Sequence, residues 1–392
     1  MANNTSSESS SIPPKSNLTN LEDNTTATTL FKQETPLYSK HVTYRIPALI
    51  YISKDQTYIA FAEKRKTKHD TDAEVLVMKR GSWKDGKNEV EWVSGYQVLS
   101  ACLPNHRSMN PCPVYERDSE TLFLFFICVP NGYSESYQIY QKRNRARLCY
   151  ITSKDTGKTW SGITDLKEVI SEKEKNWATF SVGPGHGVQM KSGRLIIPAY
   201  TFYFTSVSDK PTSHAFAFYS DDKGNTWHVG EHMDGESNEC QMAEIIDDEG
   251  NSTLYSNARG TSGYRVEALS KNGGKDFDKP SSAQELIETG ELGCQGSVLS
   301  ILSPDQSTWL IYSHPSDKEK RNDLRIYINK SPKDPMQWKT IQCINEGPSG
   351  YSDLAECEDR KYIACLFECG QESEIEMIAF KLFNISNTLD IQ

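Results

Sequence analysis

Several short polar motifs in this chain carry side chains that could bind an anion or transfer a proton. Arg45 lies in a Tyr-Arg-Ile-Pro motif, and Asp70 ends a charged stretch that begins at Phe61. A planar guanidinium group is well suited to holding a carboxylate, and a carboxyl group can act as a general acid or base. A single arginine is more often a solvated surface charge, however, and a loop rich in lysine is more often inert than catalytic. Either motif alone therefore leaves the function open.

The polypeptide that must position these side chains has the pattern of an all-β protein. From Tyr38 onward, strand-length apolar or alternating runs recur, rich in Ile, Val, Phe and Tyr and bounded by Gly, Asp, Asn or Pro, as in antiparallel strands. Helical periodicity is weak outside residues 168–175. The predicted strands include Ala48–Ile52, Tyr58–Ala62, Glu74–Met78, Leu122–Val129, Leu195–Tyr200, Ala215–Tyr219, Ser297–Leu302, Trp309–Ser313, Leu324–Ile328, Tyr362–Phe367 and Ile375–Phe380.

A repeated turn motif distinguishes between the all-β architectures. Ser153–Trp160 and Ser220–Trp227 share the spacing Ser-x-Asp-x-Gly-x-Thr-Trp, Ser270–Phe277 is a degraded copy, and Ser331 to Trp338, with Asp334, is a weaker fourth. The aspartate can bind backbone N–H groups of its own turn, glycine supplies a positive φ, and tryptophan packs between sheets. One copy alone would indicate an ordinary hairpin. Recurrence at blade-like intervals favours a β-propeller, in which these boxes have a structural role and no catalytic one.

Composition and charge limit the classes of partner. The 392-residue chain carries a net charge of −10, which argues against a nucleic-acid partner because phosphate binding requires a basic surface. The 10 cysteines are scattered without zinc-site spacing, and we expect most to be reduced core residues. Residues 1–37 are polar, and we expect a disordered tail followed by one domain over residues 38–392. Without a signal pattern or a membrane-length apolar run, we expect a location in the cytoplasm or peripherally on the plasma or intracellular membranes.

The Tyr44–Pro47 motif ahead of a series of Asp boxes resembles the (Phe/Tyr)-Arg-Ile-Pro motif of the sialidases, the exo-α-neuraminidases. The resemblance extends from about Tyr38 to Phe383. The segments Trp177–Gly187 and Ser192–Tyr200 are most similar to the membrane-associated, ganglioside-cleaving branch of the vertebrate enzymes. The resemblance implies a six-bladed β-propeller of four-stranded antiparallel sheets, with the active site at its central axis.

The resemblance implies that three arginines from distant parts of the chain hold the carboxylate of sialic acid. They are Arg45, Arg259 and Arg321, and Glu368 resembles the glutamate that keeps Arg45 in place. Sialic acid carries this carboxylate on its anomeric carbon, and guanidinium groups bind such an anion in a forked geometry. Each arginine alone would be interpreted as a surface charge. The match of all three flanking motifs favours a binding role.

The resemblance assigns Tyr351 as the nucleophile and Glu239 as its base. Most retaining glycosidases use a carboxylate nucleophile, and sialidases are a recognised exception. A carboxylate about 4 Å from the substrate carboxylate would meet a repulsion of about 4 kcal/mol at an effective dielectric constant of about 20, or roughly three orders of magnitude in rate. A neutral phenol avoids this repulsion when a base takes its proton. Without the resemblance, Tyr351 would be a core tyrosine and Glu239 a surface carboxylate, with Glu244 as a nearby alternative.

Asp70 matches the family's general acid and base, which protonates the leaving oxygen and later deprotonates water. Arg65, in the same loop, is expected to support the substrate carboxylate or Asp70 itself. On its own, this charged stretch would be interpreted as a solvated loop.

The resemblance also assigns contacts to the rest of the sugar. Asn110 and Ile127 match the pocket for the N-acetyl group. The expected contacts to the glycerol chain and ring hydroxyls are Glu135, Tyr200 and Gln295. Phe202 departs from the family pattern, which has tyrosine there, so one polar substrate contact is in question.

Together these observations predict a retaining exo-α-sialidase that needs no metal or other cofactor. The implied substrates are sialylated glycolipids (gangliosides), oligosaccharides and glycoproteins, and contact with a membrane would be peripheral. The alternative is a non-catalytic propeller that binds sialic acid or another protein, because one fold hosts many functions. A binding protein would need the arginines alone, so the full set of Asp70, Glu239 and Tyr351 favours the enzyme.

Overall fold

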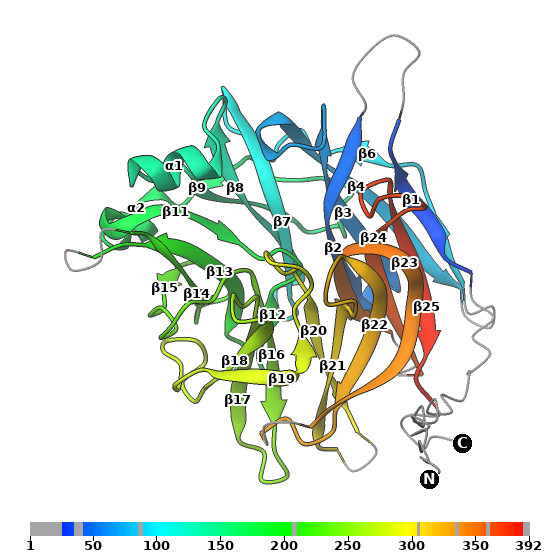
Figure 1. Ribbon diagram of the computed structural model, residues 1–392. Coiled ribbons are helices and arrows are strands. Elements are labelled where there is room, and N and C mark those ends of the chain that lie inside the picture. The colour runs from blue at the N-terminus through cyan, green and yellow to red at the C-terminus, as the bar shows by residue number, and fades with distance from the viewer. Residues whose placement is uncertain are drawn as a thin grey trace, which may run out of the picture.

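The computed structural model describes residues 26–34, 42–84, 89–205, 210–303, 306–333, 337–357 and 361–386. In these residues the chain forms 25 strands and little helix, which confirms the all-β prediction (Figure 1). The short helical elements are α1 (Glu135–Gln141), α2 (Lys167–Ile170) and 3₁₀ turns at Ser53–Asp55, Asp70–Asp72 and Lys173–Asn176. Among the helices in the described ranges, none is long and apolar enough to cross a membrane.

Four separate antiparallel sheets follow one another along the chain, each built from strands that are neighbours in the sequence. The first contains β2 (Thr43–Ile52), β3 (Thr57–Arg65), β4 (Ala73–Lys84), β5 (Glu89–Trp92) and β6 (Tyr96–Gln97). The second contains β7 (His106–Glu116), β8 (Thr121–Pro130), β9 (Arg147–Ser153) and β10 (Thr164–Asp165). The third contains β11 (Trp177–Val182), β12 (Val188–Gln189), β13 (Leu195–Tyr203), β14 (Thr212–Ser220) and β15 (His228–Val229). The fourth contains β16 (Cys240–Ile246), β17 (Ser252–Ala258), β18 (Tyr264–Ser270) and β19 (Ser281–Ile287).

A seven-stranded sheet completes the described structure, and it divides within one long strand. Its members are β20 (Ser297–Leu302), β21 (Thr308–Pro315), β22 (Asn322–Asn329), β23 (Trp338–Glu356), β24 (Tyr362–Cys369), β25 (Met377–Asn384) and β1 (Thr28–Lys32). The first part of β23, up to Pro348, pairs with β22, whereas the part from Ser349 onward pairs with β24. The two parts of this strand therefore belong to two different groups of strands.

The hydrophobic cores lie between successive groups of strands and close the arrangement into a ring. One core joins the first and second sheets through side chains such as Phe61 and Leu124. Another, which includes Ile311 and Phe367, joins β21 and β22 to β24 and β25, and a further core returns from β24 and β25 to the first sheet. Figure 1 shows the sheets around a common centre. The propeller prediction is confirmed, and the division of the seven-stranded sheet favours the predicted six blades.

Strand β1 lies inside the segment that we expected to be a disordered tail, and the structure corrects the prediction there. It pairs with β25, opposite residues Met377 to Phe380. Leu30 and Phe31 are 4% and 5% exposed, and burial of these two apolar side chains accounts for the order. The remainder of the predicted tail, residues 1–25 and 35–37, lies outside the described residues.

The Asp boxes form equivalent turns after the third strand of three successive sheets. In the second box, Asp222 accepts hydrogen bonds from Ser220 Oγ at 2.9 Å and from the N–H and Oγ1 of Thr226 at 2.8 and 2.7 Å. In the degraded box, Oδ1 of Asn272 accepts hydrogen bonds from Ser270 Oγ at 3.0 Å and from the Asp276 N–H at 3.1 Å. The degraded box thus keeps its turn through an amide oxygen. Asp334 of the weaker fourth copy lies outside the described residues.

Candidate active site

A cavity of about 500 Å³ brings together side chains from strands far apart in the chain. Twelve of the fourteen predicted site residues line it: Asp70, Glu239, Tyr351, Arg45, Arg65, Asn110, Ile127, Glu135, Tyr200, Phe202, Arg259 and Arg321. The innermost strands β2, β7, β11 and β23 and the segment before β16 supply its centre. Because these strands belong to different sheets, the cavity exists only when the ring is closed.

The two residues predicted as nucleophile and base contact each other directly. The Tyr351 hydroxyl donates a hydrogen bond to Glu239 Oε1 at 2.6 Å, and both side chains are buried. Burial, and then the charge of Glu239, raises the pKa of Tyr351 well above its usual value of 10, so the phenol holds its proton in the resting protein. A phenol in this position can pass its proton to the carboxylate as its oxygen forms a new bond.

Three guanidinium groups surround this tyrosine. Nη1 of Arg259 lies 2.7 Å from Glu239 Oε2 and 3.2 Å from Tyr351 Oη. The guanidinium carbons of Arg45 and Arg321 lie 5.5 and 5.3 Å from the centre of the Tyr351 ring. Burial opposes the charged form of Arg45 and Arg259, but nearby carboxylates outweigh it and raise the pKa of both arginines. The result is a concentrated positive field suited to a carboxylate ligand.

Glu368 on β24 connects one of these arginines to the tyrosine strand from behind the cavity. Its carboxylate is fully buried and binds Nε and Nη2 of Arg45 at 2.6 and 3.2 Å. The same carboxylate accepts the backbone N–H groups of Ile46 at 2.9 Å and Tyr351 at 3.1 Å. Glu368 therefore holds Arg45, as the family resemblance implied, although it does not itself line the cavity.

Asp70 lies at the edge of the cavity, at the start of the 3₁₀ turn Asp70–Asp72. Its side chain is 63% exposed, and its Oδ1 lies 2.6 Å from Nη1 of the buried Arg65. Arg65 is bound from the other side by Glu63, at 2.6 Å. Glu63 also accepts the backbone N–H of Asn110 at 2.7 Å. This chain of contacts holds a solvent-accessible carboxyl group beside the arginine cluster, where it can exchange protons with water and with a ligand.

Two innermost strands bend where they deliver site residues. Ile46 and Asn110 have φ values of 60° and 56°, a region that branched side chains such as isoleucine rarely adopt. Each residue precedes a proline, and the pairing register shifts at both places. Bulges of this kind redirect side chains near binding sites. Here the bends lie where Arg45 and Asn110 meet the cavity.

A second polar region of the cavity lies around Glu135 and Tyr200. Tyr200 Oη donates to Glu135 Oε2 at 3.3 Å. Glu135 is the first residue of α1. The residue as a whole is exposed, and it lines the cavity. Burial of that carboxylate, followed by the charges of Asp70 and Glu239, raises the pKa of Glu135 to about 7. The ring of Phe202 lies 6.4 Å from that of Tyr200, and both residues line the cavity.

Gln295 is the predicted contact that the structure does not bring to the cavity. It is 1% exposed, and its amide nitrogen donates to the carbonyl oxygens of Pro184 and Ser352 at 3.3 and 3.0 Å. Its amide oxygen accepts the Ser352 N–H at 3.0 Å. The side chain is therefore committed to holding strands together at the axis.

Some cavity residues were missed by the sequence analysis. Arg107 on β7 is 2% exposed and lines the cavity, and it donates to the carbonyl oxygens of Pro130 and Tyr133 at 3.1 and 2.6 Å. Strand alternation counted from Asn110 points to Ser108 and not to Arg107, because the pairing register shifts in this part of β7, so the sequence alone could not have identified it. Leu292 also lines the cavity and is 80% exposed, and no sequence signal distinguishes it from other loop residues.

Comparison with known proteins gives consistent matches over most of the chain. The family described as BNR repeat-like domain matches residues 56–363. Sialidase-3 of Mus musculus is 42% identical over 93% of this chain and 96% of its own length. Sialidase-3 of Homo sapiens is 43% identical over 90% of this chain and 91% of its own. Sialidase-2 of Mus musculus is 42% identical, over 86% and 92% of the two chains.

Two solved structures with the same fold share little sequence with this chain. The Hadza microbial sialidase Hz136 superposes with a TM-score of 0.71 at 20% identity, over 88% of this chain and 66% of its own. The intramolecular trans-sialidase from Ruminococcus gnavus, solved in complex with oseltamivir carboxylate, has a TM-score of 0.68 at 18% identity, over 89% and 96% of the two chains. At these identities the likeness concerns the fold.

Proposed function

This chain belongs to the sialidase family and is an exo-α-sialidase, and from that premise we propose that it is a retaining enzyme with Tyr351 as its nucleophile. In this proposal Glu239 is the base for the tyrosine and Asp70 is the general acid and base. The observation that carries the proposal is the 2.6 Å hydrogen bond from Tyr351 to Glu239 beside Arg259.

Substrate binding in this proposal begins with the carboxylate of sialic acid. Arg45, Arg259 and Arg321 would hold it, and their positions around the Tyr351 ring support this assignment. Binding the carboxylate there would direct the anomeric carbon, to which it is attached, toward the phenol oxygen. Orientation of this kind removes much of the entropic barrier to a bimolecular step.

In the first step, Tyr351 Oη would attack the anomeric carbon while its proton passes to Glu239. The bond to the leaving sugar oxygen breaks, and Asp70 gives that oxygen a proton. This leaves a neutral tyrosyl–sugar ether, so that no second carboxylate faces the carboxylate of the substrate. The accessibility of the Asp70 side chain, 63% exposed, supports a role on the side of the leaving group.

In the second step, Asp70, now ionised, would take a proton from a water molecule as the water oxygen attacks the anomeric carbon. The bond to Tyr351 breaks, and Glu239 returns the proton to the phenol oxygen. The two displacements restore every group to its starting protonation state. Two inversions at one carbon give net retention of configuration.

Replacement of Tyr351 by phenylalanine tests this assignment. Tyr351→Phe should fold normally but lose at least about 10³-fold in kcat on a fluorogenic sialoside, because the nucleophilic oxygen is gone. Tyr140→Phe, at an exposed tyrosine of α1 outside the cavity, is the matched control and should keep wild-type turnover. Proton NMR of wild-type turnover should show the α-anomer of sialic acid first. Near-normal activity of Tyr351→Phe, or initial release of the β-anomer, would contradict the proposal.

We also propose that glycolipids, gangliosides among them, are the preferred substrates, and that contact with a membrane is peripheral. Apolar side chains at the surface near the cavity support this. Leu292 lines the cavity and is 80% exposed, and Tyr140 is 80% exposed on α1, the helix that brings Glu135 to the cavity. Exposed apolar groups beside a polar site are suited to a lipid surface.

A comparison of substrates tests the glycolipid preference. Wild type should release sialic acid faster from gangliosides in detergent micelles than from a sialylated glycoprotein at equal sialic acid concentration. Tyr140→Ser should lower the rate on ganglioside-containing vesicles and leave the rate on a soluble sialoside unchanged, with Tyr140→Phe as the control. A faster rate on the glycoprotein would reject this preference without affecting the assignment of Tyr351.

A further inference from the structure

The proposed nucleophile and base come from strands that belong to different sheets. Tyr351 lies on β23, and Glu239 directly precedes β16. The 2.6 Å hydrogen bond between their side chains therefore depends on how these two strands are held relative to each other at the centre of the ring. One buried residue contacts both strands there, and the proposed mechanism does not use it.

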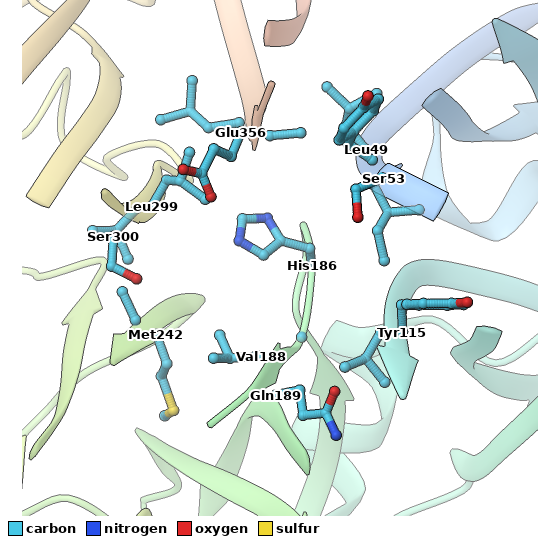
Figure 2. Close-up of a pocket in the computed structure, with 18 of the residues that line it drawn as sticks. Leu49, Ser53, Tyr115, His186, Val188, Gln189, Met242, Leu299, Ser300 and Glu356 are labelled. Carbon is cyan, nitrogen blue, oxygen red and sulfur yellow. The ribbon is translucent and has the colours of Figure 1, made fainter. Parts of the chain in front are cut away.

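This residue is His186, in the segment between β11 and β12. Figure 2 shows its ring in the middle of the innermost strands, with Leu49, Met242 and Leu299 on different sides of it. The residue is 8% exposed. It lines a cavity that shares none of its described lining residues with the active-site cavity. An effect of His186 on the reaction would consequently act through other residues.

The ring of His186 binds the strand of the nucleophile. Its Nδ1 lies 2.7 Å from Oδ1 of Asp353, a fully buried residue two positions beyond Tyr351 on β23. The same carboxylate accepts the Leu49 N–H at 2.7 Å and the Ser297 hydroxyl at 2.8 Å. Because an ionised carboxylate only accepts hydrogen bonds, Nδ1 of His186 donates. This contact fixes β23 at a point roughly 7 Å along the strand from the nucleophile, since a strand advances about 3.3 Å per residue.

The backbone of the same residue binds the strand of the base. The His186 carbonyl oxygen accepts a hydrogen bond from Nε2 of Gln241 at 3.0 Å, and Gln241 lies two positions beyond Glu239. The same amide nitrogen donates to the Pro184 carbonyl oxygen at 3.1 Å. Gln241 is fully buried, so without these partners its amide nitrogen would be left unsatisfied in the interior. His186 thus holds both strands at matching positions, two residues from the proposed catalytic pair.

The close fit of this segment between the two strands is a second constraint on their separation. Gly185, directly before His186, has a φ of 112°. A Cβ atom at this position would lie 2.6 Å from Nε2 of Gln241 and 3.1 Å from Oδ1 of Asp353. Glycine has no Cβ and therefore allows this approach. The segment is packed directly between the two side chains that it joins.

We propose that His186 is a positioning residue that sets the separation of Tyr351 and Glu239. Its ring holds one strand through Asp353, and its carbonyl oxygen holds the other through Gln241. The inference rests on the catalytic roles proposed for the tyrosine and the glutamate. Displacement of a reacting group by about 1 Å can lower a rate about 100-fold, so loss of the ring contact should lower kcat. The hydrogen bonds of His186 in the described structure involve none of the arginines that would hold the substrate carboxylate, so KM should change little.

Two amide replacements separate the hydrogen bond from the bulk of the ring. His186→Asn places its amide near the position of Nδ1 and can still donate to Asp353, whereas His186→Gln places its amide near the position of Nε2. On a fluorogenic sialoside, His186→Gln should lower kcat about tenfold or more and keep KM within about twofold of wild type. His186→Asn should retain most of the wild-type kcat. Equal losses of kcat in the two variants would overturn the inference.

Crystal structures of the two variants measure the positioning without reference to catalysis. The distance from Tyr351 Oη to Glu239 Oε1 should exceed about 3.5 Å, outside hydrogen-bonding range, in His186→Gln and stay near the wild-type value in His186→Asn. An unchanged distance in His186→Gln would overturn the inference. A longer distance with wild-type kcat would support the positioning role and reject the proposed catalytic pair, so the two failures are distinguishable.

Stability is controlled separately. Asp222→Ala, at an Asp-box turn outside the active-site cavity, should lose stability and keep the wild-type kcat. Thermal unfolding verifies that each variant is folded. If His186→Gln does not fold, Gln241→Met removes the amide on the other side of the junction and should lower kcat with KM retained. A wild-type kcat in Gln241→Met would then overturn the inference.

Discussion

The carboxylate of Glu368 binds the guanidinium group of Arg45 through both of its oxygens, at 2.6 and 3.2 Å, across 323 positions of sequence. The glutamate is fully buried and the arginine side chain is 12% exposed. In a buried pair of this kind, each charge compensates the other. Removal of either partner would leave an uncompensated charge in the interior of the protein.

Glu368→Gln should therefore impair both stability and substrate binding. Loss of one partner from a buried pair typically lowers the free energy of unfolding by about 3 kcal/mol or more, and Arg45 would also lose its orientation, which should raise KM for a sialoside. Urea unfolding and steady-state kinetics measure the two effects. Glu91→Gln, in the exposed pair with Lys84, is the control and should change the unfolding free energy by less than about 0.5 kcal/mol. Equal behaviour of the two variants would contradict the role of Glu368.

The raised pKa of Glu135 predicts a dependence of stability on pH. Its pKa is about 7 in the folded protein, above the ordinary value of 4.5, so the folded state binds more protons than the unfolded state between these values. Stability should consequently fall as pH rises through this window. In Glu135→Gln the decline between about pH 5 and 8 should be shallower, as measured by urea unfolding. Glu172→Gln, at an 85% exposed side chain, should keep the wild-type slope.

Removal of the aspartate from an Asp box should lower the stability of the protein without changing its catalytic activity. Asp222→Ala removes the acceptor for Ser220 Oγ and for two groups of Thr226. The free energy of unfolding should fall by about 2 kcal/mol, with kcat/KM unchanged, because none of these residues lines the active-site cavity. Asp222→Asn should lose less, since Asn272 holds the equivalent turn in the degraded box. A large fall in kcat/KM for Asp222→Ala would show that the boxes affect the site.

Burial of Phe31 indicates that β1 stabilises the group of strands that contains β24 and β25. The residue is 5% exposed within the core that β1 shares with β24 and β25. Phe31→Ala should lower the free energy of unfolding by about 3 kcal/mol. Thr29→Ala, at an exposed position of the same strand, should have little effect. If denaturant unfolding gives equal stabilities for the two variants, β1 does not stabilise the ring.

Local sequence was sufficient where a structure depends on neighbouring residues. The Asp boxes could be predicted because their hydrogen bonds span four residues, as from Thr226 to Asp222. The fully buried run Leu122–Val129 lies within β8. In contrast, the helical periodicity at residues 168–175 corresponds only to α2 and a 3₁₀ turn, and the strand predicted from Ile375 begins at Met377. Helix α1 was missed although Ser134 caps it, accepting the Tyr137 N–H at 3.0 Å, because its seven residues show too little periodicity.

Long-range contacts determine how the residues of the site come together. The resemblance to sialidases supplied the residues that line the cavity, which periodicity could not. It assigned Gln295 to the substrate, and the structure places the amide nitrogen of this residue against the carbonyl oxygens of Pro184 and Ser352. Nothing near Glu63 in sequence indicates that it would accept the backbone N–H of Asn110, 47 positions away. Such pairings depend on how the sheets meet, and the single sequence does not specify that geometry.

The long strand β23 has a mechanical consequence for the ring. Elsewhere in the described structure the chain leaves the ladder between sheets, as in the loops between β15 and β16 and between β19 and β20. At Pro348 and Ser349 it passes between groups of strands without leaving the ladder of hydrogen bonds. The two groups of strands are therefore least free to move relative to each other at this junction, and Tyr351 lies two residues beyond it. Under thermal or mechanical load, we expect the ring to part at its loop junctions first, leaving the tyrosine strand among the last segments to exchange its amide protons.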